Sequence, residues 1–177
     1  ATKDGDDYIL NGEKIFVTSG ERADSVVVWA TLDKKQGRAA IKSFIVPKGT
    51  AGMKVERLEH KLGIKASDTA VISFIDCRVP SVNLLGHAEI DMAKGFAGVM
   101  ETFDNTRPLV AAMAVGCAKA SLERIKEIFK DQLDENYATP YLQTSYIAAQ
   151  IYRMEAEWEA ARLLTMKAAW MADNKKP

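Results

Sequence analysis

The chain has 177 residues, of which 47% are hydrophobic and 27% are charged, so it is long enough to bury the core of one large domain or two small ones. Lys and Arg total 24, as do Asp and Glu, so the sequence has neither the basic surplus typical of nucleic-acid binding nor an acidic tail. No apolar run approaches the roughly 20 residues that span a bilayer.

The first half of the sequence predicts short β-strands separated by turn residues. The predicted strands are residues 8–10, 14–18, 25–31, 41–46, 53–58 and 69–79. Asn11-Gly12 is a strong hairpin signal between the first two strands, and Pro47 is expected to end the fourth. Strands of this length and spacing favour an antiparallel sandwich or barrel.

Beyond about residue 90 the apolar residues recur at helical spacing. Asp91 is a candidate N-cap, and Pro108 is expected to kink or restart the helix that follows. Helical spacing continues over 110–133, breaks at 134–140, and resumes over 141–173 with apolar residues at alternating steps of four and three. This seam is typical of a helix packed in a bundle rather than of a cofactor-binding surface.

The sequence therefore predicts an α+β chain with two domains. The first, residues 1–88, is an antiparallel β-sandwich or barrel, and the second, residues 89–177, is part of an all-α helical bundle. Because the chain begins with Ala1 and ends at Pro177 within a helical pattern, we expect it to be part of a longer protein.

Two segments carry more information than their predicted secondary structure. NGEKIFVTSG (residues 11–20) is a turn followed by a strand that ends in a hydroxyl and two small residues. FDNTRP (residues 103–108) places a guanidinium at the edge of an almost wholly apolar stretch. Taken singly, the first is compatible with an ordinary strand and the second with a solvated helix face. Together with the β-then-α order they resemble the acyl-CoA dehydrogenase family, and the resemblance runs through most of the chain.

The resemblance implies bound FAD at the end of the 14–18 strand. It places Phe16 on the isoalloxazine ring, Val17 beside it, and the Thr18 hydroxyl in a hydrogen bond to flavin N5. Strand alternation puts Phe16 and Thr18 on one face, as this role requires. A donor at N5 stabilises the reduced flavin as the hydride arrives. The family often has Trp where this chain has Phe16, which gives a smaller contact.

The resemblance also implies contacts to an acyl-CoA substrate. Ser67, in a polar turn that opens a strand, is expected along the channel for CoA, with an ordinary turn as the alternative. Phe103 and Asp104 are expected to line the pantetheine path, and Thr106 to face the acyl thioester. Arg107 is expected beside the active-site carboxylate, where it supports catalysis.

The catalytic base is expected outside this chain. Removal of an α-proton from a thioester needs a positioned carboxylate. In most of the family this Glu lies C-terminal to the stretch covered here, whereas a minority place it at the position of Thr106. Glu101 is roughly 140° around a helix from Thr106 and is not a candidate. The chain by itself is therefore expected to be inactive.

The stretch DQLDENYATP (residues 131–140) departs from the family pattern. The family usually carries a basic residue here, then Thr or Gln, then Phe-Gly, which reach into a neighbouring subunit's flavin site. This chain lacks the Arg and the Phe-Gly, and it adds acid where a pyrophosphate favours positive charge.

Three functions remain open from the sequence. The first is part of an FAD-dependent acyl-CoA dehydrogenase that oxidises acyl-CoA to 2,3-enoyl-CoA, passes electrons to an electron-transfer flavoprotein, and forms an oligomer, usually a tetramer. The second is a non-catalytic or half-site partner subunit of a mixed oligomer. The third is a related flavin oxidase or monooxygenase on the same fold.

The cysteines and histidines show no metal-ligand spacing. Cys77 and Cys117 fit no disulfide framework either, which favours a reducing compartment such as the bacterial cytoplasm or the mitochondrial matrix. His60 and His87 lie in loop-like contexts and are expected at the surface.

Overall fold

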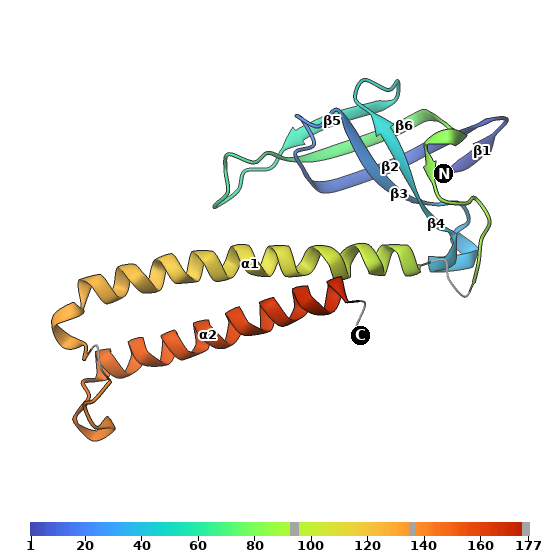
Figure 1. The fold of residues 1–177 in the computed structure, drawn as a ribbon. Helices are drawn as coiled ribbons and strands as arrows, with labels where there is room; N and C mark the ends of the chain where they lie inside the picture. The colour runs from blue at the N-terminus through green and yellow to red at the C-terminus, as the bar shows by residue number, and fades with distance from the viewer. Residues whose placement is uncertain (93–95, 135–136, 175–177) are drawn as a thin grey trace. The chain divides into compact units, whose positions relative to one another are not determined.

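The computed structural model describes residues 1–92, 96–134 and 137–174, and the chain divides into two compact units, Ala1–Gly98 and Val99–Pro177. Antiparallel strands form the first unit and two long helices dominate the second (Figure 1). The predicted order of an antiparallel β-domain followed by helices is confirmed.

The β-unit consists of two antiparallel sheets. Its strands are β1 (Thr2–Asp4), β2 (Asp7–Thr18), β3 (Ser25–Thr31), β4 (Ile41–Pro47), β5 (Met53–Leu58), β6 (Thr69–Pro80) and β7 (Leu84–Leu85), with 3₁₀ segments η1 (Lys34–Ala40) and η2 (Ser81–Asn83). One sheet has the order β1-β2-β6-β5 and the other β3-β4-β7. The predicted bounds of β3 and β5 are confirmed, and β4 and β6 each extend one residue further than predicted.

The predicted hairpin at Asn11-Gly12 is wrong, because β2 runs through both residues. The hairpin instead joins β1 to β2 at Gly5-Asp6, where Gly5 has φ 59°. At Asn11 the register against β6 shifts, and the Asn11 side chain bonds to the bulged partner strand. Its Oδ1 accepts the Asp76 N–H at 2.8 Å, and its Nδ2 donates to Asp76 Oδ1 at 3.2 Å. The Asn-Gly pair therefore marks an irregularity in a strand and not its end.

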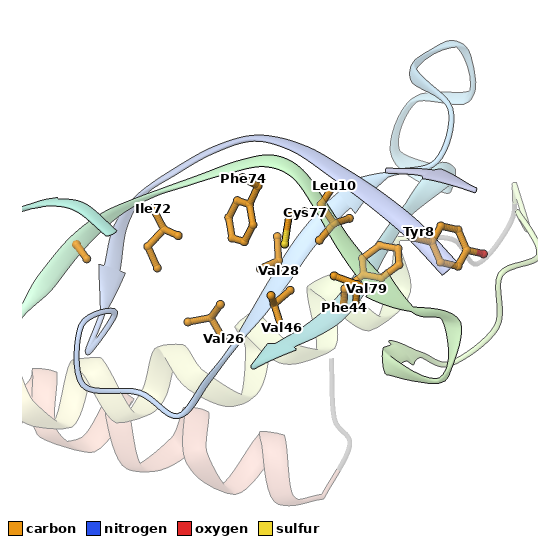
Figure 2. Close-up of a cluster of buried hydrophobic side chains, with 11 residues drawn as sticks. Tyr8, Leu10, Val26, Val28, Phe44, Val46, Ile72, Phe74, Cys77 and Val79 are labelled. Carbon is orange, nitrogen blue, oxygen red and sulfur yellow. The ribbon is translucent and has the colours of Figure 1, made fainter. Parts of the chain in front are cut away.

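The core of the β-unit lies between the two sheets (Figure 2). It comprises Tyr8, Leu10, Val26, Val28, Phe44, Val46, Ala70, Ile72, Phe74, Cys77 and Val79. The rings of Tyr8 and Phe44 meet edge to face with centroids 5.1 Å apart, which links β2 to β4. Burial raises the pKa of the Cys77 thiol, which behaves here as a small apolar side chain.

The helical unit is an antiparallel pair, α1 (Ala97–Ile128) and α2 (Tyr146–Asp173), with 3₁₀ segments η3 (Lys130–Gln132) and η4 (Tyr141–Gln143) between them (Figure 1). Trp158 Nε1 of α2 donates to Val115 O of α1 at 3.1 Å. The Ser145 hydroxyl caps α2 by accepting the Ala148 N–H at 3.1 Å. The helix predicted from residue 141 therefore begins later, after this cap.

Two predictions for the first helix are corrected. Asp91 does not cap it, because α1 begins at Ala97; residues 93–95 lie outside the described residues. Pro108 does not restart it either, since α1 is continuous on both sides of this residue. Proline cannot donate to the carbonyl of Asp104, one turn earlier. Because Asp104 is exposed, water can satisfy that carbonyl instead.

The predicted seam of α2 is only partly buried. Ile151 is 1% exposed, and Trp158 is half-buried, whereas Met154 is 40% exposed. Large apolar side chains remain exposed on both helices: Leu109, Val110, Met113, Leu163, Leu164, Met166 and Trp170. A two-helix pair that leaves this much apolar surface is typical of part of a larger bundle, as predicted. Within the described residues, no helix has the length and apolar character needed to cross a bilayer.

Candidate functional site

The end of β2 carries Phe16 and Thr18 on a distorted backbone. The register against β6 shifts between Lys14 and Val17, so β2 has a bulge there. Phe16 lies in this bulge with φ 60°, a conformation that is unfavourable for a bulky residue. Phe16 is 67% exposed, Val17 packs against the core, and Thr18 is exposed. The bulge interrupts the alternation of side chains along β2. Strand periodicity by itself therefore does not establish that Phe16 and Thr18 lie on one face.

The turn after Thr18 is held tightly against β6. Ser19 has φ 57°, and its N–H donates to Asp68 O at 2.9 Å. A Cβ on Gly20 would lie 2.7 Å from Ala70 Cβ, so only glycine fits there without a shift. The close contact of Gly20 with Ala70 therefore fixes the path of the chain where it leaves β2.

Asp68 fixes this turn with its side chain as well as its carbonyl. Asp68 Oδ2 accepts the Glu21 N–H at 2.9 Å. Asp68 Oδ1 lies 3.5 Å from Arg22 Nε and makes no hydrogen bond to the described residues. The Asp68 side chain is 7% exposed, whereas that of Arg22 is 72% exposed. A largely buried carboxylate thus faces one backbone donor and one solvated cation.

Ser67 belongs to a loop that is closed by Lys61. Lys61 Nζ donates to Ile64 O at 2.8 Å and to Ser67 O at 2.5 Å. Because Thr18 pairs with Thr69 across β2 and β6, Ser67 lies at the same end of this sheet as Thr18. The structure therefore brings together the predicted flavin-contacting strand end and the predicted CoA-contacting serine.

A cavity of about 270 Å³ adjoins this end of the sheet. Its lining is mostly charged, with Glu21, Arg22, Leu58, Glu59, His60, Lys61, Lys65, Ser67, Asp68 and Thr69. A larger cavity of about 510 Å³ opens between β2 and β3, but no predicted site residue lines it. Of the predicted site residues in this unit, Ser67 lines the smaller cavity and none lines the larger one.

The remaining predicted site residues cluster on α1 in the helical unit. Arg107 Nη1 lies 3.6 Å from Asp104 Oδ1, and the Arg107 guanidinium carbon lies 5.3 Å from the centroid of the Phe103 ring. The Thr106 hydroxyl donates to Thr102 O at 2.9 Å, a bond back into the helix. All four predicted side chains are exposed, so a surface constellation of ring, carboxylate, hydroxyl and guanidinium is available to a ligand.

The divergent stretch at 131–140 folds back on its own unit; Glu135 and Asn136 lie outside the described residues. Asp134 Oδ2 accepts the Thr139 N–H at 2.8 Å and the Thr139 hydroxyl at 2.7 Å. The Tyr137 hydroxyl donates to Glu155 Oε2 at 2.7 Å, and Lys126 Nζ donates to Glu155 Oε1 at 2.9 Å. The hydrogen bond from Lys126 lowers the pKa of Glu155, and the bond to Glu155 raises the pKa of Tyr137.

Sequence reasoning missed Asp68 and Lys61 as organising residues. Asp68 had a signal, since Ser-Asp-Thr suits a turn whose side chain binds nearby backbone, but its partner Glu21 is distant in sequence. Lys61 had none. His60 and His87 are exposed, as predicted, and among the described residues no group of three or more potential metal ligands occurs.

The residues at the end of β2 fit a flavin. The Thr18 hydroxyl is exposed and has no hydrogen-bond partner among the described residues, so it is free to donate to a ring nitrogen. The exposed ring of Phe16 offers an apolar face of the kind that packs on an aromatic cofactor.

Comparisons with known proteins identify the family. The family model for the acyl-CoA dehydrogenase middle domain matches residues 1–77, and that for the acyl-CoA dehydrogenase C-terminal domain matches residues 93–177. The chain is 37% identical to the mitochondrial short-chain specific acyl-CoA dehydrogenase of Rattus norvegicus, covering 100% of this chain and 42% of the relative. It is 36% identical to the cyclohex-1-ene-1-carbonyl-CoA dehydrogenase of Syntrophus aciditrophicus (strain SB), covering 99% of this chain and 41% of the relative.

Solved structures give the same result. Butyryl-CoA dehydrogenase from Megasphaera elsdenii is 39% identical with a TM-score of 0.85, over 99% of this chain and 45% of that one. A chain in a structure of the electron transferring flavoprotein of Acidaminococcus fermentans is 38% identical with a TM-score of 0.82, again over 99% and 45%. The chain spans less than half the length of these relatives. The resemblance inferred from residues 11–20 and 103–108 is confirmed, and the chain belongs to the acyl-CoA dehydrogenase family.

Proposed function

We propose that the protein, in its full-length form, is an FAD-dependent dehydrogenase that oxidises an acyl-CoA to the 2,3-enoyl-CoA. The observation that carries this proposal is the end of β2, where an exposed Phe16 ring and a Thr18 hydroxyl without a described partner lie beside the Ser67 loop. Membership of the family supports it.

In this proposal β2 supplies the contacts to the flavin ring. Phe16 packs on the ring, Val17 anchors the strand end to the core, and Thr18 donates a hydrogen bond at N5. The chemistry that FAD supplies when bound is acceptance of the β-hydride. A donor held at that position favours the reduced form without reorganising during the reaction.

In this proposal Ser67 and four residues of α1 have roles in binding different parts of the acyl-CoA. Ser67 contacts the CoA portion, Phe103 and Asp104 line the pantetheine path, and Thr106 faces the thioester. Arg107, which pairs with Asp104 at 3.6 Å, lies beside the carboxylate that takes the α-proton. That carboxylate is outside this chain, so residues 1–177 alone are inactive in this proposal.

The substrate class is an acyl-CoA thioester, because the named relatives share CoA and differ in the acyl group: short-chain acyl, cyclohexene carbonyl and butyryl. Electrons pass to an electron-transferring flavoprotein, which the similar chain in the Acidaminococcus fermentans structure supports. Relatives from mitochondria and from bacteria support the mitochondrial matrix or the bacterial cytoplasm as the compartment. The proposal also includes an oligomer, such as the homotetramer that is usual in the family.

A second candidate function is that of a half-site partner in a mixed oligomer. The 131–140 stretch supports it, because its Asp134 and Tyr137 bond to Thr139 and Glu155 of the same unit. This segment offers a neighbouring subunit's cofactor no arginine, and an added acid disfavours a pyrophosphate.

The test is the visible spectrum of the full-length protein before and after anaerobic addition of a panel of acyl-CoAs. A yellow protein that bleaches with an acyl-CoA supports the dehydrogenase, and Thr18→Val should slow bleaching whereas Thr2→Val, an exposed threonine on β1 of the same sheet, should not. A colourless protein supports the half-site partner. Bound flavin that no acyl-CoA bleaches overturns the dehydrogenase in favour of an oxidase or monooxygenase.

A further inference from the structure

Asp68 joins the two segments of the β-unit to which the proposed function assigns flavin and CoA. On one side it follows Ser67 directly, at the end of the loop closed by Lys61. On the other it binds the turn after β2 twice, through its carbonyl to the Ser19 N–H and through its carboxylate to the Glu21 N–H, each at 2.9 Å.

The turn that Asp68 binds has an unfavourable backbone. Thr18 lies between two residues with positive φ, Phe16 at 60° and Ser19 at 57°. Residues other than glycine keep a positive φ only when contacts with the surrounding structure stabilise that conformation. The bond from the Ser19 N–H to Asp68 O is one such restraint, and the bond at Glu21 is a second on the same turn.

The carboxylate of Asp68 is largely buried and has few partners. Its side chain is 7% exposed, and burying a carboxylate is costly unless it is well paired. Among the described residues it forms an ion pair with Arg22, which is 3.5 Å away and itself exposed, and Oδ1 makes no hydrogen bond to them.

We propose that Asp68 is a positioning residue that fixes the turn at residues 19–22 and thereby sets the Thr18 hydroxyl for the flavin. This inference rests on the proposed function, since it assigns Thr18 to the cofactor. Asp68 acts through backbone donors and does not itself touch the flavin.

A double-mutant cycle on the full-length flavoprotein tests the inference. Asp68→Ala should weaken FAD binding by about threefold to tenfold, the value of one lost hydrogen bond, and should shift the flavin midpoint potential in the direction that Thr18→Val shifts it. The double variant should change the potential no more than the larger single change, because both act through one hydroxyl. Asp68→Asn, which keeps the acceptor for the Glu21 N–H, should restore most of the affinity.

Asp33→Ala is the matched control, because Asp33 also accepts a backbone N–H, from Lys35 at 2.8 Å, but on the connection between β3 and β4. It should leave both the affinity and the potential unchanged. If Asp68→Ala does not fold, Lys48→Met loosens the same turn by removing the bond from Lys48 Nζ to Glu21 O, and it should shift the potential in the same direction.

The outcomes separate the two proposals. Additive effects of Asp68→Ala and Thr18→Val, or an unchanged potential in the folded variants, overturn the inference and leave the dehydrogenase standing. A wild-type protein that binds no flavin overturns the dehydrogenase proposal and this inference with it.

Discussion

Replacing Gly52 with alanine tests how closely β6 packs against the turn before β5. Gly52 has φ 86°, and a Cβ at this position would lie 2.2 Å from Ile75 O and 2.8 Å from Cys77 Cα. Both neighbours are backbone atoms, so no side-chain rotation relieves the clash. The Ile75 N–H also donates to Gly52 O at 2.8 Å, and this bond must lengthen if the strands separate.

The magnitude follows from three contributions. The positive φ costs alanine about 1–2 kcal/mol. Displacing packed backbone costs about 1–3 kcal/mol, by analogy with overpacked cores, and loss of the Ile75 bond about 0.5–1.5 kcal/mol. We therefore expect Gly52→Ala to destabilise the β-unit by about 2.5–6.5 kcal/mol. Gly49→Ala is the matched control, because Gly49 has φ 81° in the same turn but nothing within 4 Å of its Cβ position, and it should cost only about 1–2 kcal/mol.

The assay is urea unfolding followed by tryptophan fluorescence. Trp29 is the only tryptophan of the β-unit, so replacing Trp158 and Trp170 with phenylalanine makes the signal specific to that unit. Equal losses of free energy in Gly52→Ala and Gly49→Ala would refute the reasoning, because the close approach of β6 would then have no energetic consequence.

Two further predictions concern single side chains. Asn11→Ala should lower the free energy of unfolding of the β-unit by about 1–2 kcal/mol, because both hydrogen bonds to Asp76 are lost. Glu13→Ala is the control, because Glu13 is exposed on the same strand, and it should change this free energy little. The same urea assay measures both variants, and equal effects would contradict the prediction. The folded-state pKa of Glu155 is lowered, chiefly by the bond from Lys126, so its contribution to stability is present above its ordinary pKa of 4.5 and is lost as the pH falls through the folded-state value. Glu155→Gln should therefore lower the free energy of unfolding by about 0.5–1 kcal/mol at pH 7. Thermal unfolding followed by the helical circular dichroism signal should show that the difference from wild type shrinks below pH 4.5. A difference that grows on acidification would contradict the role given to Glu155.

Local patterns predicted much of the secondary structure. β3 and β5 have the predicted bounds because β-branched or alternating residues and flanking turn residues define each within a few positions. The helix boundaries were less accurate. The helix was predicted from residue 141, whereas α2 begins at Tyr146, after the Ser145 cap.

The sequence predicted a set of candidate site residues but not how they are arranged. Phe16, Thr18 and Ser67 were predicted from motif resemblance, and strand pairing then places Thr18 opposite Thr69. The distorted backbone at Phe16 and the role of Asp68 had no equivalent in the sequence pattern, because both depend on how β2 registers against β6.

The sequence by itself determined the order of a β-domain followed by helices, the family, and the residue types available for cofactor and substrate, since periodicity and short motifs are local properties. Only the tertiary structure decided that β2 continues through Asn11-Gly12, that Gly52 must be glycine, and that Asp68 ties the turn after β2 to the Ser67 loop. In each case the partner is distant in the chain: Asn11 bonds to Asp76, Gly52 meets Ile75, and Asp68 bonds to Glu21. A hydrogen bond or a clash between residues so far apart exists only after the strands have paired, so a local pattern cannot contain it.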